Sequence, residues 1–178
     1  MAVINLNPRN PYTQGDYESY NYSNPEAVIN LAEYIFNPQK TPSQYQKFYG
    51  VPNASPECIQ NSFAAIASIH NKDMKGRRKA EHFVLSFNNQ KELSEIGGIN
   101  GAVDVINQYC ESLAVDYQLA YAAHEDKEHF HAHIIINPIN YHTGKRMQKN
   151  RAFLEEQRST VKNLVITQKL AYSSNTQN

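Results

Sequence analysis

The 178-residue chain carries 17 basic and 17 acidic residues, and 40% of its residues are hydrophobic. This length and composition suit one globular domain with a single core. The balanced charge excludes an overall basic field, so a nucleic-acid partner, if there is one, would have to be bound by a local basic patch. We expect neither a membrane span nor a signal peptide, because the sequence has no long apolar run. Cys58 and Cys110 have no metal or redox spacing, and we interpret them as free thiols of a cytoplasmic protein.

The N-terminal half of the chain is predicted to contain a short strand at 3–6 and two helices. Residues 1–23 are otherwise rich in Tyr and Asn without periodicity, so they are interpreted as an arm or loop. Asn24-Pro25 begins the first helix, which Asn37-Pro38 ends. Ser55-Pro56 begins the second helix. The two apolar stripes consist of Val28, Leu31 and Ile35, and of Ile59, Phe63 and Ile66.

The C-terminal half is predicted to alternate strands and helices. Apolar and more polar residues alternate at 82–87, as in a strand with one face in the core. Residues 99–113 repeat apolar side chains at spacings of four and three, which is typical of a helix. Strands at 117–124 and 129–138, joined by a short acidic turn, predict an antiparallel hairpin, and a helix at 150–170 follows. We therefore expect an α+β domain with a central antiparallel β-sheet and helices packed mainly on one face.

Four of the seven histidines lie within ten residues of one another. Side chains two apart in a strand project to the same face, so His131 and His133 stand side by side, and the hairpin brings His124 across from them. Three neutral imidazoles that leave positions for water or substrate are typical of a Lewis-acid metal site. We therefore predict a metal site on the sheet face away from the helices. His129 lies on the same face and could replace His124 or support the site, and Asp126 is suited to orienting an imidazole.

The segment from His124 to Asn137 resembles the His-hydrophobe-His motif of relaxases, the rolling-circle-type nucleases of plasmid and transposon transfer. A histidine seven residues before His131, an acid two residues after His124 and an Asn four residues after His133 all fit this motif.

Two further segments resemble the MOB-P group of relaxases in particular. Their catalytic tyrosine lies in a segment similar to residues 33–41, and their middle motif is similar to residues 82–87. The three matches follow the order of the family and span about residues 24–150. The resemblance implies that residues 1–178 form a single relaxase or nickase domain and are the N-terminal part of a longer protein.

The resemblance further implies a site- and strand-specific DNA nickase that cleaves by metal-assisted transesterification and leaves a covalent 5′-phosphotyrosine. Tyr34 matches the nucleophile. A phenol, with a reference pKa of about 10, attacks poorly at neutral pH, so a cation or a base must assist it. Mn²⁺ or Mg²⁺ is the expected ion, although imidazole-rich sites also take Zn²⁺, Ni²⁺ or Co²⁺. From the residues alone Tyr34 would be an aromatic packing under a loop, and the alternative nucleophiles are Tyr20, Tyr22, Tyr45 and Tyr49.

His82 is expected on the strand face that carries the site, where it positions a phosphate or assists proton transfer. A hydrogen-bonded histidine at a strand end is an equally good interpretation. Asn137 points the same way as the metal ligands and could hold a ligand or the DNA. Backbone phosphates are expected to contact a turn at 143–146 and the cations that follow it in sequence, and Lys40 and residues 76–79 could extend this surface. The predicted DNA-binding residues are Lys40, Arg77, Arg78, Lys145, Arg146 and Lys149.

The implied partner is single-stranded or hairpin DNA at an origin of transfer, together with accessory relaxosome proteins. Three alternatives stay open. A replication initiator or transposase uses the same motif, a three-histidine metal hydrolase or oxygenase needs no covalent intermediate, and a non-catalytic DNA-binding module would bind an origin hairpin without cutting it.

Overall fold

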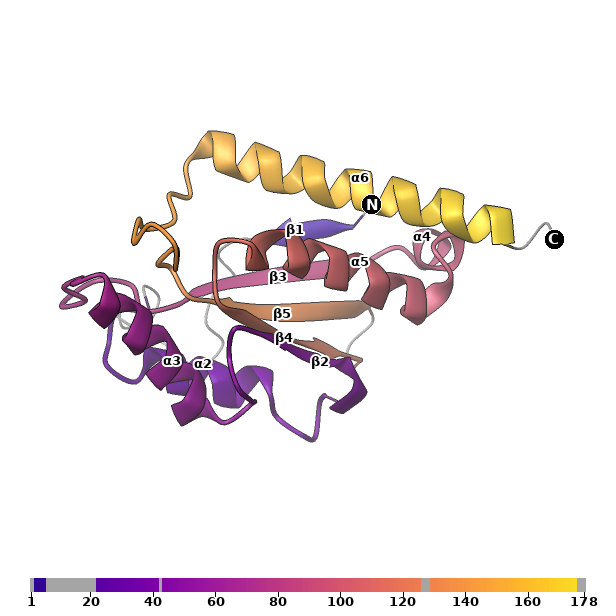
Figure 1. Cartoon of the computed structure of the whole chain (residues 1–178). Helices are drawn as coiled ribbons and strands as arrows, with labels where there is room; N and C mark the ends of the chain where they lie inside the picture. The colour runs from indigo at the N-terminus through magenta and orange to yellow at the C-terminus, as the bar shows by residue number, and fades with distance from the viewer. Residues whose placement is uncertain (1, 6–21, 42, 126–128, 176–178) are drawn as a thin grey trace.

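The computed structural model describes residues 2–5, 22–41, 43–125 and 129–175. At its centre lies a five-stranded antiparallel sheet in the order β1-β3-β5-β4-β2 (Figure 1). The strands are β1 (Val3–Asn5), β2 (Gln46–Tyr49), β3 (Glu81–Phe87), β4 (Leu119–His124) and β5 (Phe130–Ile136). The helices are α2 (Ala27–Ile35), α3 (Pro56–Ile69), α4 (Gln90–Glu95), α5 (Gly98–Ala114) and α6 (Arg151–Asn175), with a 3-10 turn at Ser43–Tyr45. The predicted α+β class is confirmed.

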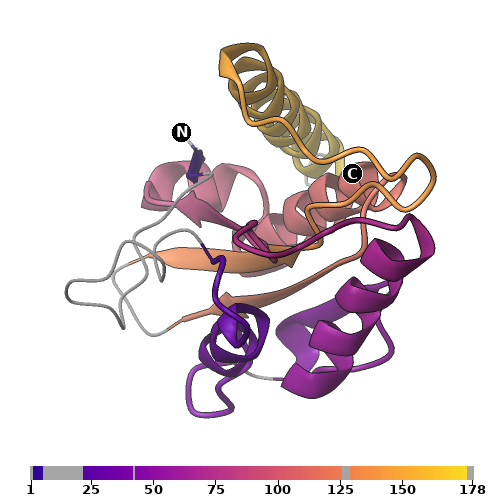
Figure 2. The ribbon, with the colours of Figure 1, turned by 90° about the vertical axis from the view of Figure 1, so that its left-hand side faces the viewer.

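Helices lie on both sides of this sheet. Figure 2 shows α5 and α6 above it and α2 and α3 below it. The larger core lies on the α5 and α6 side and takes Phe83, Leu85 and Phe87 of β3. A smaller core on the other side takes the apolar stripe of α2 together with Ile135 of β5. The helices therefore pack mainly on one face, but α2 and α3 also cover part of the face that the sequence analysis assigned to the histidines alone.

Strand β5 is buried along its whole length because it has a neighbour on each side and a helical layer on each face. Its alternation separates two kinds of side chain. Phe130, Ala132, Ile134 and Ile136 belong to the larger core, whereas the histidines between them face α2. This period of two fixes the register, since a slip of one residue would place imidazoles in the apolar core.

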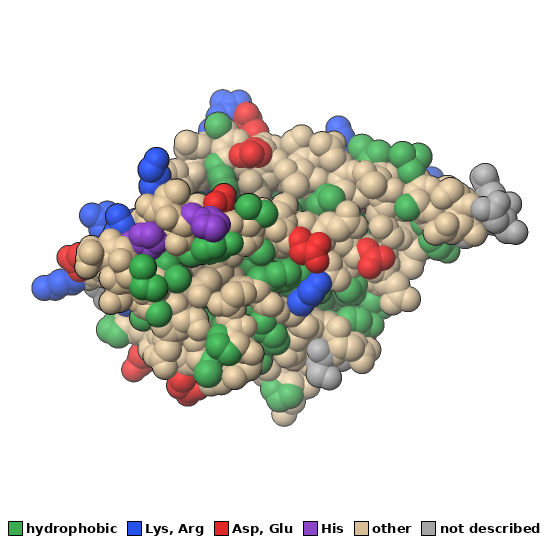
Figure 3. All heavy atoms as spheres, viewed as in Figure 1, with side chains coloured by type: hydrophobic (Ala, Val, Ile, Leu, Met, Phe, Trp, Pro, Cys, Tyr) green, Lys and Arg blue, Asp and Glu red, His purple; other side chains and the backbone are tan. Residues whose placement is uncertain are grey.

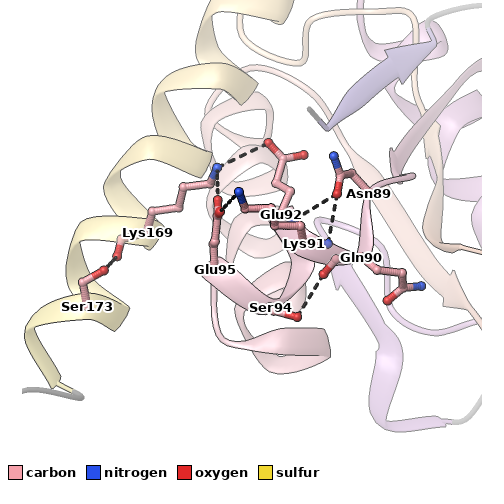
Figure 4. A network of polar contacts seen from close by, with 8 residues as sticks. All are labelled: Asn89, Gln90, Lys91, Glu92, Ser94, Glu95, Lys169 and Ser173. Atoms are coloured by element: carbon pink, nitrogen blue, oxygen red, sulfur yellow. Dashed lines mark hydrogen bonds and ion pairs between the residues drawn. The ribbon is translucent and has the colours of Figure 1, made fainter.

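Two elements have only a weak signal in the sequence. Strand β2 is four residues long and pairs with β4 at the edge of the sheet. Helix α4 is six residues long, and the Asn89 side chain caps it by accepting hydrogen bonds from the backbone N–H groups of Lys91 and Glu92 (Figure 4). The start of α2 also differs from the expectation, because its N-cap is Glu26 rather than Asn24. The backbone carbonyl of Asn24 accepts a hydrogen bond from the backbone N–H of Ala27.

Helix α6 extends five residues beyond the predicted 170, to Asn175, and lies across α4 and α5 (Figure 1). Lys169 forms ion pairs with Glu95 at 2.8 Å and with Glu92 at 3.7 Å, which link the second half of α6 to α4 (Figure 4). The hydrogen bond to Glu95 raises the pKa of Lys169. None of the helices in the described part of the chain is long and apolar enough to cross a membrane.

A buried hydrogen bond joins α5 to α6, and its removal gives a stability prediction. The hydroxyl of Tyr109 donates to Oε1 of Gln157 at 2.9 Å, and both side chains are buried. Tyr109→Phe would leave that amide oxygen without its donor, so the free energy of unfolding is expected to fall by about 1–3 kcal/mol. Urea unfolding measures this. Tyr117→Phe, at a half-buried position, is the control and should change the value by less than about 0.5 kcal/mol.

Candidate functional site

The register of the hairpin brings three histidines together. His131 and His133 are two residues apart on β5, and His124 of β4 lies directly opposite His131. One ring nitrogen from each lies within 4.8 Å of those from the other two, a spacing that could hold a metal ion. The three side chains are only 1%, 4% and 6% exposed for His124, His131 and His133. The predicted convergence of these three imidazoles is confirmed.

Each of these histidines also uses one ring nitrogen to hold its ring in place. Nε2 of His124 lies 2.9 Å from the carbonyl oxygen of Ile35, and Nδ1 of His131 lies 3.2 Å from that of His129. A carbonyl oxygen only accepts, so both nitrogens carry the proton and donate it. In a neutral ring the opposite nitrogen then carries the lone pair that can bind a cation.

The ring of His133 is held by a side chain instead of a carbonyl. Its Nδ1 lies 2.9 Å from Nε2 of His82, so its Nε2 is the nitrogen on the side of the cluster. The donor set fits a divalent ion, because three imidazoles have their second nitrogens occupied by orienting partners. The ligand atoms would be Nδ1 of His124 and Nε2 of His131 and of His133.

Tyr34 reaches this cluster from the last turn of α2. Its hydroxyl oxygen lies 3.5 Å from Nε2 of His133. The edge of its ring contacts the rings of His133 and His124, with centroid distances of 5.0 and 6.2 Å. Val28, Leu31 and Ile35 bury one stripe of α2 against the sheet, and Tyr34 lies beside that stripe and is half-buried. Lys40 places its ammonium 6.0 Å from the centre of the Tyr34 ring.

The alternative tyrosines lie elsewhere. Tyr45 and Tyr49 pack against the larger core, on the opposite side of the sheet from the cluster. Burial raises the pKa of Tyr49 well above its usual range. Tyr22 is 2% exposed and hydrogen-bonds to His82, and Tyr20 lies outside the described residues. Of the described tyrosines named as alternatives, none contacts the cluster histidines as Tyr34 does.

His82 lies behind the cluster rather than at its opening. It is 1% exposed, and its two ring nitrogens are 2.9 Å from Nδ1 of His133 and 2.9 Å from the hydroxyl of Tyr22. Burial, helped by the charges of Lys149 and His124, lowers the pKa of His82 to about 3, so the ring is neutral. His82 lies diagonally across from His133 on the neighbouring strand. Val84 pairs with His133, and His82 is two residues away from Val84 on the same face of β3. The hydrogen bond between Tyr22 and His82 was not predicted, because nothing in the sequence spacing of the two residues indicates it.

The other predicted supporting residues have different positions. His129 contacts the site through its backbone carbonyl, with its ring 5.6 Å from that of His131. Asn137 follows β5, where its amide donates to Gln118 at 3.1 Å and its side-chain oxygen accepts from the backbone of Ile139. It therefore shapes the turn after β5. Asp126 lies outside the described residues.

Three of the predicted DNA-binding cations surround a buried carboxylate. Glu81 forms ion pairs with Arg78 at 3.0 Å and with Lys149, and Arg146 donates to the backbone carbonyl of Arg78 at 2.6 Å. Burial lowers the pKa of Lys149, and Glu81 opposes this effect.

The remaining cations of this region are exposed. Arg77 and Lys145 lie on the loops after α3 and β5, and Gly144 adopts a positive φ of 67° in the predicted turn. Lysine and arginine side chains gather at this end of the molecule in Figure 3. Of the predicted DNA-binding cations in this region, Arg77 and Lys145 are therefore exposed, whereas Arg78 and Lys149 are paired with Glu81.

A phenol thus lies beside three converging imidazoles that could hold a metal ion. Comparison with known proteins shows the class of this domain. The family model "Relaxase: MobA/VirD2-like, nuclease domain" matches residues 34–170, and the chain belongs to this family. The resemblance inferred from the motifs is therefore confirmed.

Two curated relatives illustrate the match. "Protein rlx" of Staphylococcus aureus is 40% identical over 72 residues, which cover 40% of this chain and 18% of that protein. The "Group II intron-interrupted relaxase LtrB" of Lactococcus lactis subsp. cremoris is 27% identical over 152 residues, covering 71% of this chain and 26% of the relative. The chain thus spans about a fifth to a quarter of the length of these relatives.

Proposed function

We propose that this domain is a site- and strand-specific nickase that cuts single-stranded or hairpin DNA at an origin of transfer and stays attached to it through Tyr34. The observation that carries the proposal is the hydroxyl of Tyr34, 3.5 Å from Nε2 of His133 within the three-histidine cluster. A tyrosine placed against three convergent imidazoles can attack a phosphate that is bound at the same point.

The proposed reaction is a reversible transesterification. The phenol of Tyr34 gives up its proton as its oxygen attacks the phosphorus of the scissile diester. The bond from phosphorus to the 3′-oxygen breaks and the 3′-oxygen takes up a proton, so no net proton is gained or lost. One product is a 5′-phosphotyrosine and the other is a free 3′-hydroxyl, so the bond energy is conserved and the reverse reaction can rejoin the strand. A divalent ion, with Mn²⁺ or Mg²⁺ as the proposed species, would neutralise the charge that develops on the phosphate.

The surface cations would position the DNA backbone around this point. Lys40 lies beside the Tyr34 ring and is the proposed contact near the scissile phosphate. Arg77 and Lys145 are exposed and would contact more distant phosphates. Arg78, Arg146 and Lys149 would act mainly by holding the two basic loops together around Glu81, with a smaller share in binding.

The proposal is tested with single-stranded oligonucleotides that tile the DNA next to the coding sequence of the chain. Each is labelled at the 5′ or the 3′ end, incubated with protein and Mn²⁺, and run on a denaturing gel. We expect one oligonucleotide to give a shortened fragment with the 5′ label and a protein-linked fragment with the 3′ label. EDTA should prevent both products.

Other patterns would contradict the proposal in different ways. Cleavage that leaves both fragments free of protein would favour a hydrolase. Binding of a hairpin oligonucleotide without cleavage, with and without Mn²⁺, would favour a non-catalytic module.

A further inference from the structure

A chain of hydrogen bonds runs from the candidate metal centre to Tyr22, a buried tyrosine that packs in the smaller core with α2. Tyr34 lies 3.5 Å from Nε2 of His133, Nδ1 of His133 lies 2.9 Å from Nε2 of His82, and Nδ1 of His82 lies 2.9 Å from the hydroxyl of Tyr22. His82 and Tyr22 are 1% and 2% exposed, so their mutual hydrogen bond is shielded from water. In such a buried chain each hydrogen bond needs one donor and one acceptor, so the position of the proton on one ring determines its position on the next.

Only one arrangement suits a cation at Nε2 of His133. That nitrogen must then carry a lone pair, so the proton of the neutral ring sits on Nδ1 and is donated to Nε2 of His82. His82 accepts there and therefore carries its own proton on Nδ1, which it donates to the oxygen of Tyr22. In the reverse arrangement Tyr22 donates to His82, His82 donates to His133, and the proton of His133 moves to Nε2, where it blocks metal binding.

We propose that Tyr22 and His82 are positioning residues that hold His133 in its metal-binding tautomer. The phenol oxygen of Tyr22 keeps the proton of His82 on Nδ1, and His82 in turn keeps the proton of His133 on Nδ1. Neither residue touches the reacting atoms. The inference rests on the proposed function only in taking His133 as a metal ligand.

The position of Tyr22 is itself well fixed. Its backbone has a φ of +50°, its carbonyl accepts a hydrogen bond from the backbone of Lys79 at 2.7 Å, and the guanidinium of Arg78 lies 5.8 Å from its ring centre. The ring stands edge-on to that of His82 at a centroid distance of 6.0 Å. These contacts hold the backbone and the ring of Tyr22 in place, so its hydroxyl stays within hydrogen-bond distance of Nδ1 of His82.

The first test measures Mn²⁺ affinity by electron paramagnetic resonance on the full chain without DNA. Tyr22→Phe keeps the ring and removes the oxygen, and we expect affinity to fall by about 10-fold or more, the range for lost partners of ligating histidines. His82→Leu should cause a similar loss. His82→Gln should recover most of the affinity, because its side-chain oxygen can accept the Nδ1 proton of His133. Tyr117→Phe is the matched control and should bind as wild type.

The second test reads the tautomer directly from histidine side-chain ¹H–¹⁵N spectra of the metal-free chain. We expect His133 to be protonated at Nδ1 in the wild type and to shift toward Nε2 in Tyr22→Phe. Unchanged tautomer and affinity in Tyr22→Phe, or equal losses in His82→Gln and His82→Leu, would overturn the inference while leaving the nickase proposal intact. A wild-type chain that binds no Mn²⁺ would instead remove the metal centre on which the proposed function depends.

Discussion

Replacing Tyr34 with phenylalanine is expected to abolish the covalent DNA adduct, with a loss of cleavage on the order of 10³-fold or more. The hydroxyl is the proposed nucleophile, and the phenyl ring has no atom that can attack phosphorus. The measurement is adduct formation on a denaturing gel with the cleaved oligonucleotide and Mn²⁺, over a time course long enough to detect a residual rate.

The fold and the metal site should survive this change. The contacts of the Tyr34 ring with His133 and His124, and the approach of Lys40 to its face, involve ring atoms that phenylalanine keeps. Mn²⁺ affinity and the urea midpoint are therefore expected to stay close to the wild-type values. Loss of cleavage together with loss of metal binding would point to a disturbed centre rather than a missing nucleophile.

Tyr45→Phe provides the matched control. Tyr45 is half-buried and packs edge-on against Phe130 in the larger core, with a centroid distance of 5.8 Å. Its hydroxyl is on the other side of the sheet from the histidines, so this variant should form the adduct at the wild-type rate. An adduct that persists in Tyr34→Phe and disappears in Tyr45→Phe would reassign the nucleophile.

The histidine cluster was predictable from the sequence because it depends on a local rule. The period of two in β5 places His131 and His133 on one face whatever the rest of the fold does, and a short hairpin can bring His124 opposite only one stretch of its partner strand. The longer helices were predictable for a similar reason, since apolar spacing over many turns gives a clear stripe. Helix α5 is the plainest case, with its stripe buried between the sheet and α6.

The sequence predicted that His82 faces the site, but its hydrogen bonds to His133 and Tyr22 were not predictable, because they join distant parts of the chain. Tyr22 and His82 are 60 residues apart, and His82 and His133 are 51 residues apart. The sequence also does not show which cations are neutralised by a carboxylate in the fold. Arg78 and Lys149 were predicted to bind DNA, but both form ion pairs with Glu81. Strand β2 and helix α4 are too short for periodicity to distinguish them from loops.

His131→Ala is expected to lower Mn²⁺ affinity by at least about 100-fold, more than the 10–100-fold typical of a lost outer partner, and to abolish cleavage with it. Removing one of three imidazoles leaves two protein ligands, too few to hold the ion at micromolar concentrations. Calorimetric titration of Mn²⁺ into the metal-free chain measures the affinity, and the labelled oligonucleotide measures cleavage. Partial recovery of cleavage at millimolar Mn²⁺ would agree with this cause, because mass action can refill a weakened site.

His129→Ala tests whether the third metal ligand beside His131 and His133 is His124 or His129. His129 contacts the centre through its carbonyl oxygen, which alanine also has, so Nδ1 of His131 should keep its acceptor at 3.2 Å and Mn²⁺ affinity should change by less than about threefold. If the ring of His129 replaced that of His124 as a ligand, His129→Ala would be as damaging as His131→Ala, and His124→Ala would be mild. The geometry favours the first result, because the carbonyl of Ile35 holds His124 at 2.9 Å with its other nitrogen toward His131 and His133. The same carbonyl belongs to Ile35, the residue after Tyr34. Helix α2 therefore supplies both the proposed nucleophile and the acceptor that orients a proposed metal ligand, and a shift of this helix would disturb both.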